Sequence, residues 1–413
     1  MKRMKKRKIT TRLVHTPFPK KDAHDSLNFP VYDSVAFEAE SAEELELAFK
    51  GEKFRHLYSR ITNPTVEYFE AKIKNLTGAY AVTALSSGMA AISNLIMAIG
   101  KSGDNIISSL HLFGNTLSLF EKTLKPYGLS VKYTDLTDPE KVEKLVDSNT
   151  IAIFFETITN PQLEVASIQA LSDIASKHNL ILIADTTLTP PSVFNAAEAG
   201  INFEVLSSTK YLSGGATSVG GLVIDYGNYS WEKFDKTSEA FKRHGQPAFN
   251  MMFRKQIFRN MGACLSAHNA YLQSLGLDTL DLRTDRSASN ALALAKWLEV
   301  HPGILQVHYP GLSSSPYNDI STQQFGPKPC SLLTFDLESK KQCFKFMNKL
   351  NVIRRSTNLQ DNKTLAIHPS STIFVEYSEE QQKNMGLRDT MIRVSVGIED
   401  LEDLQNDLEQ ALN

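Results

Sequence analysis

The chain has 413 residues, of which 42% are hydrophobic and 22% are charged, the proportions of an ordinary globular protein. A chain of this length is too long for one hydrophobic core, so we expect two domains and a short arm. Because the formal net charge is only −2, the overall electrostatic field gives no reason to propose a nucleic acid or a membrane as a partner.

The N-terminus and the cysteines argue against further classes of protein, namely secreted, disulfide-rich and metal-binding ones. A basic run, Met1–Lys8, is followed by polar residues instead of an apolar stretch, which argues against a secretory signal. No apolar run in the sequence is long enough to span a bilayer. Cys264, Cys330 and Cys343 lie far apart without a Cys-x-x-Cys spacing, so neither a metal site nor a disulfide framework is expected. We therefore expect a cytoplasmic protein with reduced thiols.

The first predicted elements follow a segment with few helix signals. This segment ends near Tyr58 and Arg60, just before an Asn-Pro turn at Asn63-Pro64. Residues 66–76 have the apolar spacing of an amphipathic helix, which Gly78 ends.

A strand at residues 79–85 leads into Ser86-Ser87-Gly88-Met89 and the start of another helix. Free backbone amides at a helix N-terminus favour an anion, so Ser87, Gly88 and Met89 are a candidate phosphate site. A serine in this position is also a common helix cap.

Two further predicted strands are followed by residues of interest. Residues 104–109 form the first of these strands and lead to Phe113, and residues 152–155 form the second and lead to Asn160-Pro161. An Asn-Pro pair is also common in loops that have no functional role.

The next two apolar runs end at groups that can do chemistry. Residues 180–184 stop at Asp185, and residues 201–206 stop at the hydroxyls and the amine of Ser207, Thr209 and Lys210. Adjacent strands would place the carboxylate and the amine at one sheet edge, where open α/β sheets bind ligands. Such a lysine can form a Schiff base with an aldehyde cofactor, and a carboxylate facing a pyridine nitrogen keeps it protonated. The pattern predicts pyridoxal phosphate chemistry.

Glycines follow the lysine closely. Gly214, Gly215, Gly220 and Gly221 indicate backbone that passes close to a ligand without side chains in the way.

The last third of the chain changes to longer helices. Residues 290–300 have amphipathic spacing, and residues 303–312 are expected to begin a smaller α+β domain. Near the C-terminus, Met391–Asp400 forms a strand-like stretch that contains Arg393.

The stretches SSTKYLSGGATSVGG, YSRITNPT, SSGMAA and MIRVSVGIED resemble motifs of the Cys/Met-metabolism family of pyridoxal phosphate enzymes. The resemblance implies a fold-type I, aspartate-aminotransferase-like α/β architecture with a mostly parallel seven-stranded sheet and a small C-terminal α+β domain. The expected parts are an N-terminal arm over residues 1–60, a cofactor-binding domain over 61–254 and a small domain over 255–413. The family is usually a homotetramer built of two dimers.

The resemblance also implies roles for single residues. Lys210, Asp185 and Phe113 would be catalytic, and Arg393, Asn358 and Asn160 would bind the substrate, with Arg393 clamping its α-carboxylate. Tyr58 and Arg60 would reach the cofactor phosphate of a neighbouring subunit. The full set implied for the cofactor is Ser87, Gly88, Met89, Phe113, Asn160, Asp185, Ser207, Thr209, Lys210, Tyr58 and Arg60.

The chain departs from the family pattern at several positions. Phe113 stands where a tyrosine is usual, so its ring can stack on the cofactor but has no proton to exchange. Thr186 stands for an asparagine, and Gly215 stands for a histidine. Asn358-Leu359-Gln360 stands where relatives have Ser-Leu-Gly.

The expected reaction is γ-replacement on an activated homoserine ester, with O-acetylhomoserine and sulfide giving homocysteine and acetate in methionine biosynthesis. O-succinylhomoserine and cysteine are close competitors as substrates, as in a cystathionine γ-synthase. A γ-lyase acting on methionine or cystathionine is the rival enzyme class, although Asn115 stands where methionine-cleaving relatives carry a cysteine. The departures also leave open a cofactor-binding homologue with reduced or repurposed activity.

Overall fold

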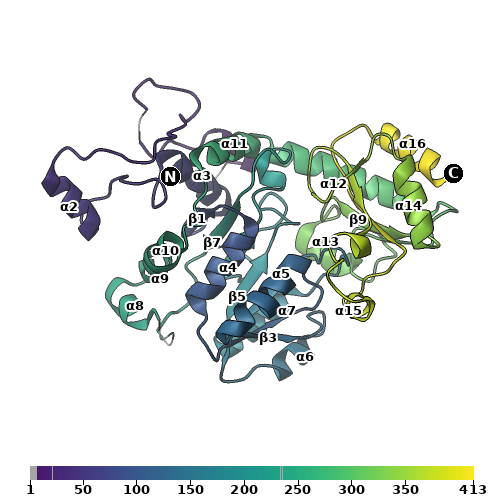
Figure 1. The fold of residues 1–413 in the computed structure, drawn as a ribbon, viewed down its shortest axis with the longest axis horizontal. Coiled ribbons are helices and arrows are strands. Elements are labelled where there is room, and N and C mark those ends of the chain that lie inside the picture. The colour runs from purple at the N-terminus through teal and green to yellow at the C-terminus, as the bar shows by residue number, and fades with distance from the viewer. Residues whose placement is uncertain (1–6, 21, 233, 235) are drawn as a thin grey trace.

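The computed structural model describes residues 7–20, 22–232, 234 and 236–413 (Figure 1). Residues 1–6 of the predicted basic run therefore lie outside the described residues. Two sheets, one in each half of the chain, organise the fold. Among the helices of the described residues, none combines the length and the apolar character needed to cross a membrane.

The larger sheet has seven strands, and only β7 runs against the others. The prediction of a mostly parallel seven-stranded sheet is thus confirmed. In spatial order its strands are β1 (Ala81–Leu85), β7 (Gly221–Asp225), β6 (Phe203–Leu206), β5 (Ile181–Asp185), β4 (Thr150–Glu156), β2 (Asn105–Ser108) and β3 (Ser130–Tyr133).

Both faces of this sheet are covered, which explains why its strands are continuous apolar runs instead of alternating ones. Phe154 and Ile183 point to the face that α4 (Gly88–Ile99) covers, while Leu182 points to the face that α7 (Ile168–His178) covers. The strand ends, and not the strand faces, are therefore where polar side chains can meet a ligand.

The smaller sheet lies in the C-terminal half and is mixed. In spatial order it comprises β10 (Arg354–Arg355), β11 (Leu365–Ile367), β12 (Met391–Ser395), β9 (Leu332–Asp336) and β8 (Gln306–His308). Three helices, α12 (Leu280–Glu299), α14 (Lys340–Lys349) and α16 (Leu401–Leu412), lie together with it in Figure 1 and share its apolar core. The predicted domain limits at residues 60 and 254 stay predictions.

Helix α12 has 20 residues and begins ten residues before the predicted helix at residues 290–300. Its first half lacks an apolar stripe because buried polar side chains replace it. Arg283 donates to the carbonyls of Tyr211 (2.7 Å) and Gly276 (2.6 Å). A hydrophobic pattern cannot reveal a helix face whose contacts are hydrogen bonds.

The remaining helices are mostly short and connect or cover these sheets. They are α1 (Ile9–Val14), α2 (Ala42–Lys50), α3 (Pro64–Thr77), α5 (Gly114–Ser118), α6 (Pro139–Lys144), α8 (Ser238–His244), α9 (Pro247–Met252), α10 (Arg259–Met261), α11 (Ala267–Asp278), α13 (Asn318–Phe325) and α15 (Glu379–Asn384). The predicted helix at residues 66–76 is α3, which Asn63 caps through the amides of Thr65 and Val66. Figure 1 shows α2 on a segment that extends away from the body of the protein.

Candidate active site

A cavity of about 500 Å³ lies at the carboxyl ends of β4, β5 and β6. Segments from both halves of the chain line it, including the N-terminus of α4 and the strand β12. Of the residues predicted to form a site, all but two line this cavity: Ser87, Gly88, Met89, Phe113, Asn160, Asp185, Ser207, Thr209, Lys210, Asn358 and Arg393.

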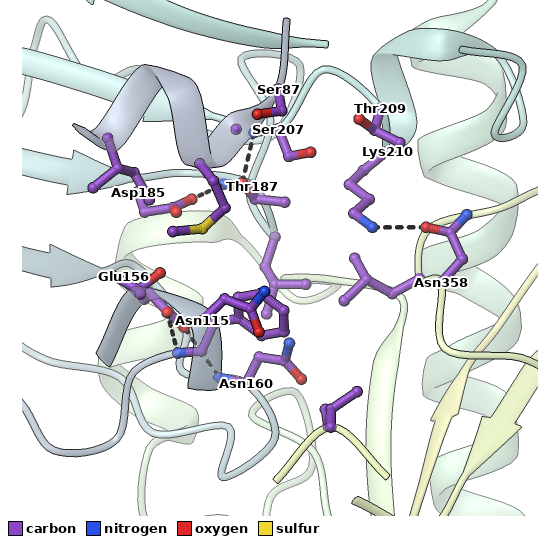
Figure 2. Close-up of a pocket in the computed structure, with 18 of the residues that line it drawn as sticks. Ser87, Asn115, Glu156, Asn160, Asp185, Thr187, Ser207, Thr209, Lys210 and Asn358 are labelled. Carbon is purple, nitrogen blue, oxygen red and sulfur yellow. Dashed lines mark hydrogen bonds between the residues drawn. The ribbon is translucent and has the colours of Figure 1, made fainter. Parts of the chain in front are cut away.

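Asp185 and Lys210 reach into the cavity from opposite sides, with Ser87 and Ser207 near one end between them (Figure 2). This arrangement follows from the parallel pairing of β5 with β6, which brings both strand ends to the same sheet edge. The predicted adjacency of the two strands is confirmed.

The amine of Lys210 is held by a side chain of the small sheet domain. Its Nζ donates to Asn358 Oδ1 at 2.7 Å. Burial lowers the pKa of Lys210 to about 8, and the charge of Arg393 acts in the same direction, while Asp361 opposes it. A lysine in this state loses its proton near pH 8, well below the pH at which an exposed lysine does, which suits a nucleophile or a base.

Asp185 lies beside a second carboxylate, which the sequence analysis did not assign. Glu156 ends β4 directly opposite Asp185 in the parallel register. Burial raises the pKa of both carboxyl groups, and the charge of Asp185 raises that of Glu156 further. Asp185 Oδ1 accepts from the amide of Thr187 at 2.9 Å. A cation facing this pair would relieve the repulsion between the two carboxylates.

Glu156 holds two predicted site residues by their backbones. One carboxylate oxygen accepts from the amide of Phe113 at 2.6 Å, and the other accepts from the amide of Asn160 at 3.2 Å. The sequence contains a signal for this residue, because β4 ends in an acid at the same sheet edge as β5 does. Glu156 therefore fixes the loops that carry Phe113 and Asn160.

The N-terminus of α4 forms a cradle suited to an anion. Ser87 caps this helix by accepting from the amide of Ala90 at 3.0 Å. A Cβ on Gly88 would lie 2.8 Å from the Cβ of Ser207, so only glycine allows the two segments to approach this closely. The resulting pocket of helix amides and nearby hydroxyls favours a phosphate group.

The interpretation of the later glycines was wrong, because protein and not a ligand occupies the space beside them. A Cβ on Gly215 would lie 2.4 Å from Asn362 Nδ2, and one on Gly221 would lie 2.0 Å from the carbonyl oxygen of Ser87. Likewise, Gly214 faces Gly276 and Gly220 faces Gln273. None of the four glycines is among the residues that line the cavity.

Arg393 on β12 is a buried cation that has no carboxylate partner in the described part of the chain. Its side chain donates to Asn160 Oδ1 at 3.0 Å and to the carbonyls of Thr357 and Asn358 at 3.2 Å each. Its Nε has no partner among the described residues. Burial lowers the pKa of Arg393 to about 9. A buried guanidinium with neutral partners and an unused donor is suited to bind an anionic ligand such as a carboxylate.

Tyr58 and Arg60 lie outside this cavity. Tyr58 is 42% exposed, the guanidinium of Arg60 lies 5.4 Å from its ring centre, and Arg60 donates to the carbonyl of Arg259 at 2.6 Å. Their predicted action on the site of a neighbouring subunit stays a prediction.

The departure at Thr186 is accompanied by a third buried carboxylate, that of Glu204. Thr186 Oγ1 donates to Glu204 on β6, whose other oxygen accepts from the hydroxyl of Tyr226 at 2.6 Å. Burial raises the pKa of Glu204 to about 7. The threonine hydroxyl is thus a hydrogen-bond donor for a carboxylate that lies one strand away.

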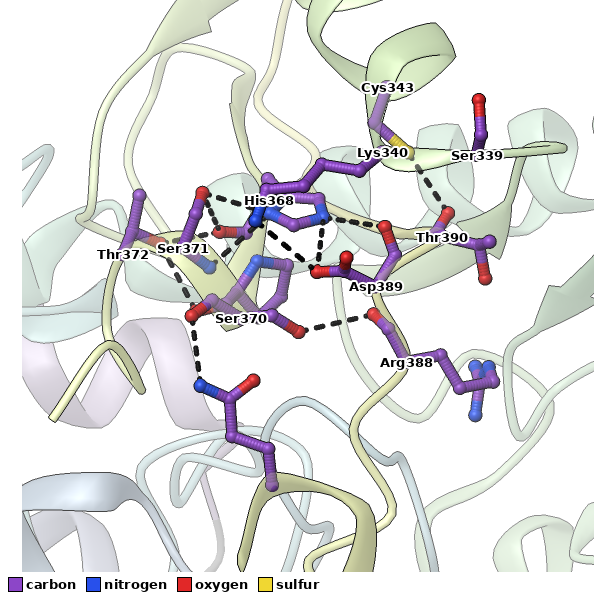
Figure 3. Close-up of polar contacts among 12 residues, drawn as sticks. Ser339, Lys340, Cys343, His368, Ser370, Ser371, Thr372, Arg388, Asp389 and Thr390 are labelled. Carbon is purple, nitrogen blue, oxygen red and sulfur yellow. Dashed lines mark hydrogen bonds and ion pairs between the residues drawn. The ribbon is translucent and has the colours of Figure 1, made fainter. Parts of the chain in front are cut away.

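Figure 3 shows a buried histidine, His368, among polar contacts close to the cavity-lining residue Ile373 in the sequence. His368 Nδ1 accepts from the amide of Ser371 at 3.3 Å, and its Nε2 lies 2.9 Å from the carbonyl oxygen of Asp389. These contacts fix the short helix η5 (Pro369–Ser371), and Ile373 just beyond it lines the cavity.

Comparisons with known proteins agree with this geometry. A family model described as "Cys/Met metabolism PLP-dependent enzyme" matches residues 10–413. The chain is 34% identical over 417 aligned positions to O-acetyl-L-homoserine sulfhydrylase of Corynebacterium glutamicum, covering 97% of this chain and 95% of the relative.

Two solved structures are also similar. One, from Campylobacter jejuni, is named as an O-acetylhomoserine (thiol)-lyase with N'-pyridoxyl-lysine-5'-monophosphate; it has a TM-score of 0.94 and 30% identity, covering 98% of this chain and all of the other. The other, an O-acetylhomoserine sulfhydrylase of Wolinella succinogenes, has a TM-score of 0.80 and 41% identity with 98% and 100% coverage. The predicted family resemblance and fold-type I architecture are confirmed.

Proposed function

This chain belongs to the Cys/Met metabolism PLP-dependent enzyme family, and we propose that it catalyses γ-replacement on an activated homoserine ester. The proposed substrates are O-acetylhomoserine and sulfide, and the products are homocysteine and acetate, as in methionine biosynthesis. The names of the relatives from Corynebacterium glutamicum and Wolinella succinogenes support this choice of substrate. The cytoplasmic location of the protein stays a prediction.

The observation on which the proposal depends is that three charged groups converge on one cavity: Lys210, Asp185 and Arg393. Their chemistry fits pyridoxal phosphate and an amino acid. Lys210 would bind the aldehyde, Asp185 would face the protonated pyridine nitrogen, and Arg393 would bind the α-carboxylate. The cradle formed by the N-terminus of α4 and Ser207 would hold the phosphate. When bound, this cofactor withdraws electrons from the Cα of the amino acid, which makes the Cα proton acidic.

Proton transfer would then be the task of Lys210. Phe113 has no ionisable group, and both oxygens of Glu156 already accept from backbone amides. Asp185 would be engaged with the cofactor. Of the titratable side chains described in the cavity, Lys210 is therefore the one suited to take a proton from Cα and then from Cβ. Breaking of the Cγ–O bond with loss of acetate, formation of the Cγ–S bond with sulfide, and return of the protons from Lys210 to Cβ and Cα would complete the replacement.

An assay with and without sulfide tests this proposal. Purified enzyme is incubated with O-acetylhomoserine, and homocysteine, oxobutanoate and ammonia are measured. Homocysteine that forms only when sulfide is present supports the replacement reaction. Oxobutanoate and ammonia as the main products would instead identify a lyase, and no turnover would favour the homologue with reduced activity. K210A is the control, because it removes the reactive amine.

We further propose that two copies of the chain share each active site. The segment around α2 exposes large apolar side chains, with Phe49 75% and Phe54 62% exposed, and α2 has no buried residue. A second copy that covers this surface would remove apolar area from water. It would also bring Tyr58 and Arg60 to the phosphate end of the partner's cavity.

Hybrid dimers test the shared site. R60A should weaken cofactor retention, and mixing it with K210A should restore part of the activity, because one site in a hybrid then has both intact residues. Absence of recovery in hybrids that are verified by mass would contradict the sharing of sites.

A further inference from the structure

The loop that carries Asn358 holds the amine of Lys210 through one amide, and the orientation of this amide depends on a neighbouring acid. Asn358 Oδ1 accepts from Lys210 Nζ at 2.7 Å, while Asn358 Nδ2 donates to Asp361 Oδ2 at 3.2 Å. The other oxygen of Asp361 accepts from the amide of Lys363 at 3.2 Å. Three side chains thus form a continuous chain of hydrogen bonds that ends at the reactive nitrogen.

The backbone of this loop is anchored independently of Asp361. The carbonyl of Asn358 accepts from Arg393 at 3.2 Å, and the amide of Gln360 donates to Ser395 Oγ at 2.6 Å. Asn362 Nδ2 donates to the carbonyl of Gly214 at 2.9 Å. Because the backbone is fixed, the main freedom left to Asn358 is the direction of its amide, which has a donor end and an acceptor end of nearly equal shape.

The direction of the amide matters for a base. A neutral amine that donates one N–H to Asn358 Oδ1 keeps its lone pair free for a proton from the substrate. If the amide were reversed, Nδ2 would donate to this lone pair and occupy it. Asp361 prevents the reversal, because a carboxylate accepts hydrogen bonds and repels the carbonyl end of the amide.

We propose that Asp361 is a positioning residue that acts on Lys210 through the amide of Asn358. This inference rests on the proposed function, in which Lys210 carries protons. Asp361 does not line the cavity, and the hydrogen bonds that connect it to Lys210 pass through Asn358. The charge of Asp361 also favours the protonated form of Lys210.

The substitution D361N is a sensitive test of the proposal, because it replaces a single oxygen in this chain of hydrogen bonds with an NH₂ group. The carbonyl oxygen of the new amide can still accept from the amide of Lys363, which leaves its NH₂ group facing Asn358. Asn358 then gains by turning its oxygen toward this group, so that its own NH₂ group faces Lys210. D361E, which keeps the carboxylate, is expected to restore part of the wild-type behaviour. D400N is the matched control, because it removes an equal charge from an exposed residue paired with Arg286.

The first measurement does not require turnover. The full-length chain is stripped of its cofactor, and labelling of Lys210 by an amine-selective acylating reagent is followed against pH by mass spectrometry. D361N should shift the labelling midpoint down by about half a pH unit, since it removes one partly screened negative charge. D400N should keep the wild-type midpoint.

The second measurement uses the enzyme with its cofactor. In D361N, kcat should fall about tenfold with KM within about twofold of wild type, the cost of losing one oriented, charge-assisted hydrogen bond. The kinetic isotope effect with substrate deuterated at Cα should increase, because proton transfer becomes slower relative to the other steps. A role in folding alone would not change this isotope effect.

A wild-type midpoint and a wild-type isotope effect in D361N would overturn the proposal. If D361N does not fold, D361A is measured instead and should show the same shift and the same isotope effect. If the wild-type enzyme forms no homocysteine, the proposed reaction fails, whereas the labelling midpoint still decides whether Asp361 acts on Lys210.

Discussion

Replacing Arg393 with lysine tests whether this residue binds the substrate carboxylate. Lysine keeps the positive charge, but its compact ammonium replaces a planar fork of N–H donors. The guanidinium of Arg393 donates hydrogen bonds to Asn160 Oδ1 and to the carbonyls of Thr357 and Asn358. Its Nε has no partner among the described residues and so remains available to a ligand. A lysine cannot make these contacts and also offer more than one donor to a ligand.

The magnitude follows from the bonds that would be lost. Losing one buried, charge-assisted hydrogen bond to a carboxylate costs about 2–3 kcal/mol. At about 1.4 kcal/mol for each factor of ten, kcat/KM for O-acetylhomoserine should fall about 30- to 150-fold in R393K. Thermal unfolding of the variant should occur at a lower temperature, because buried acceptors that Arg393 satisfies would lose their donors.

The assay compares O-acetylhomoserine with the acetate ester of aminopropanol, which is the same molecule without its carboxylate. The penalty should be large for the first substrate and small for the second. R388K is the matched control: Arg388 lies in the same sheet domain and pairs with Asp336 at 2.9 Å, but it does not line the cavity. An equal loss of kcat/KM for both substrates in R393K would refute carboxylate binding by Arg393.

Three other outcomes follow from the site. The pKa of Lys210 is lowered to about 8, so its amine is mostly protonated below that pH. The rate at which the protein captures pyridoxal phosphate should therefore rise through about pH 8 and level off above it. A rate that is independent of pH from about 6 to 10 would contradict this expectation. G88A places a Cβ 2.8 Å from the Cβ of Ser207, which would force the two segments apart. Retention of the cofactor during dialysis should therefore weaken at least about tenfold. Full retention would show that the cradle is not tightly packed. H368A removes the buried hydrogen bonds that the ring makes to Ser371 and Asp389, and should lower the free energy of unfolding by about 2–3 kcal/mol in denaturant titrations. An unchanged midpoint would exclude this structural role.

Much of the large sheet could be predicted from local patterns. The apolar runs that became β5 and β6 stop at Asp185 and just before Lys210, and the pairing of these strands brings both groups to one edge. The helix that begins at Gly88 was indicated by its serine cap and the strand before it. These features depend on residues close together in the chain, so single-sequence reasoning is suited to them.

Contacts between segments that are far apart in the sequence could not be predicted from local patterns. Glu156 directly follows the predicted strand at residues 152–155, and nothing local indicated that its oxygens would accept from the amides of Phe113 and Asn160. Thr186 looked like an isolated departure until Glu204 was seen beside it. The glycines after Lys210 were assigned to a ligand, although their neighbours are other parts of the protein.

The sequence by itself determined the strand ends, the helix cap and the family, because each depends on residue types at short and regular spacing. Only the tertiary structure decided which groups meet. Arg393 and Asn160 are 233 positions apart, and Asn358 lies 148 positions from Lys210, yet each pair is within hydrogen-bond distance. The reason is physical: such contacts are set by how the two sheet domains pack together, and that packing depends on the whole core and not on any one segment.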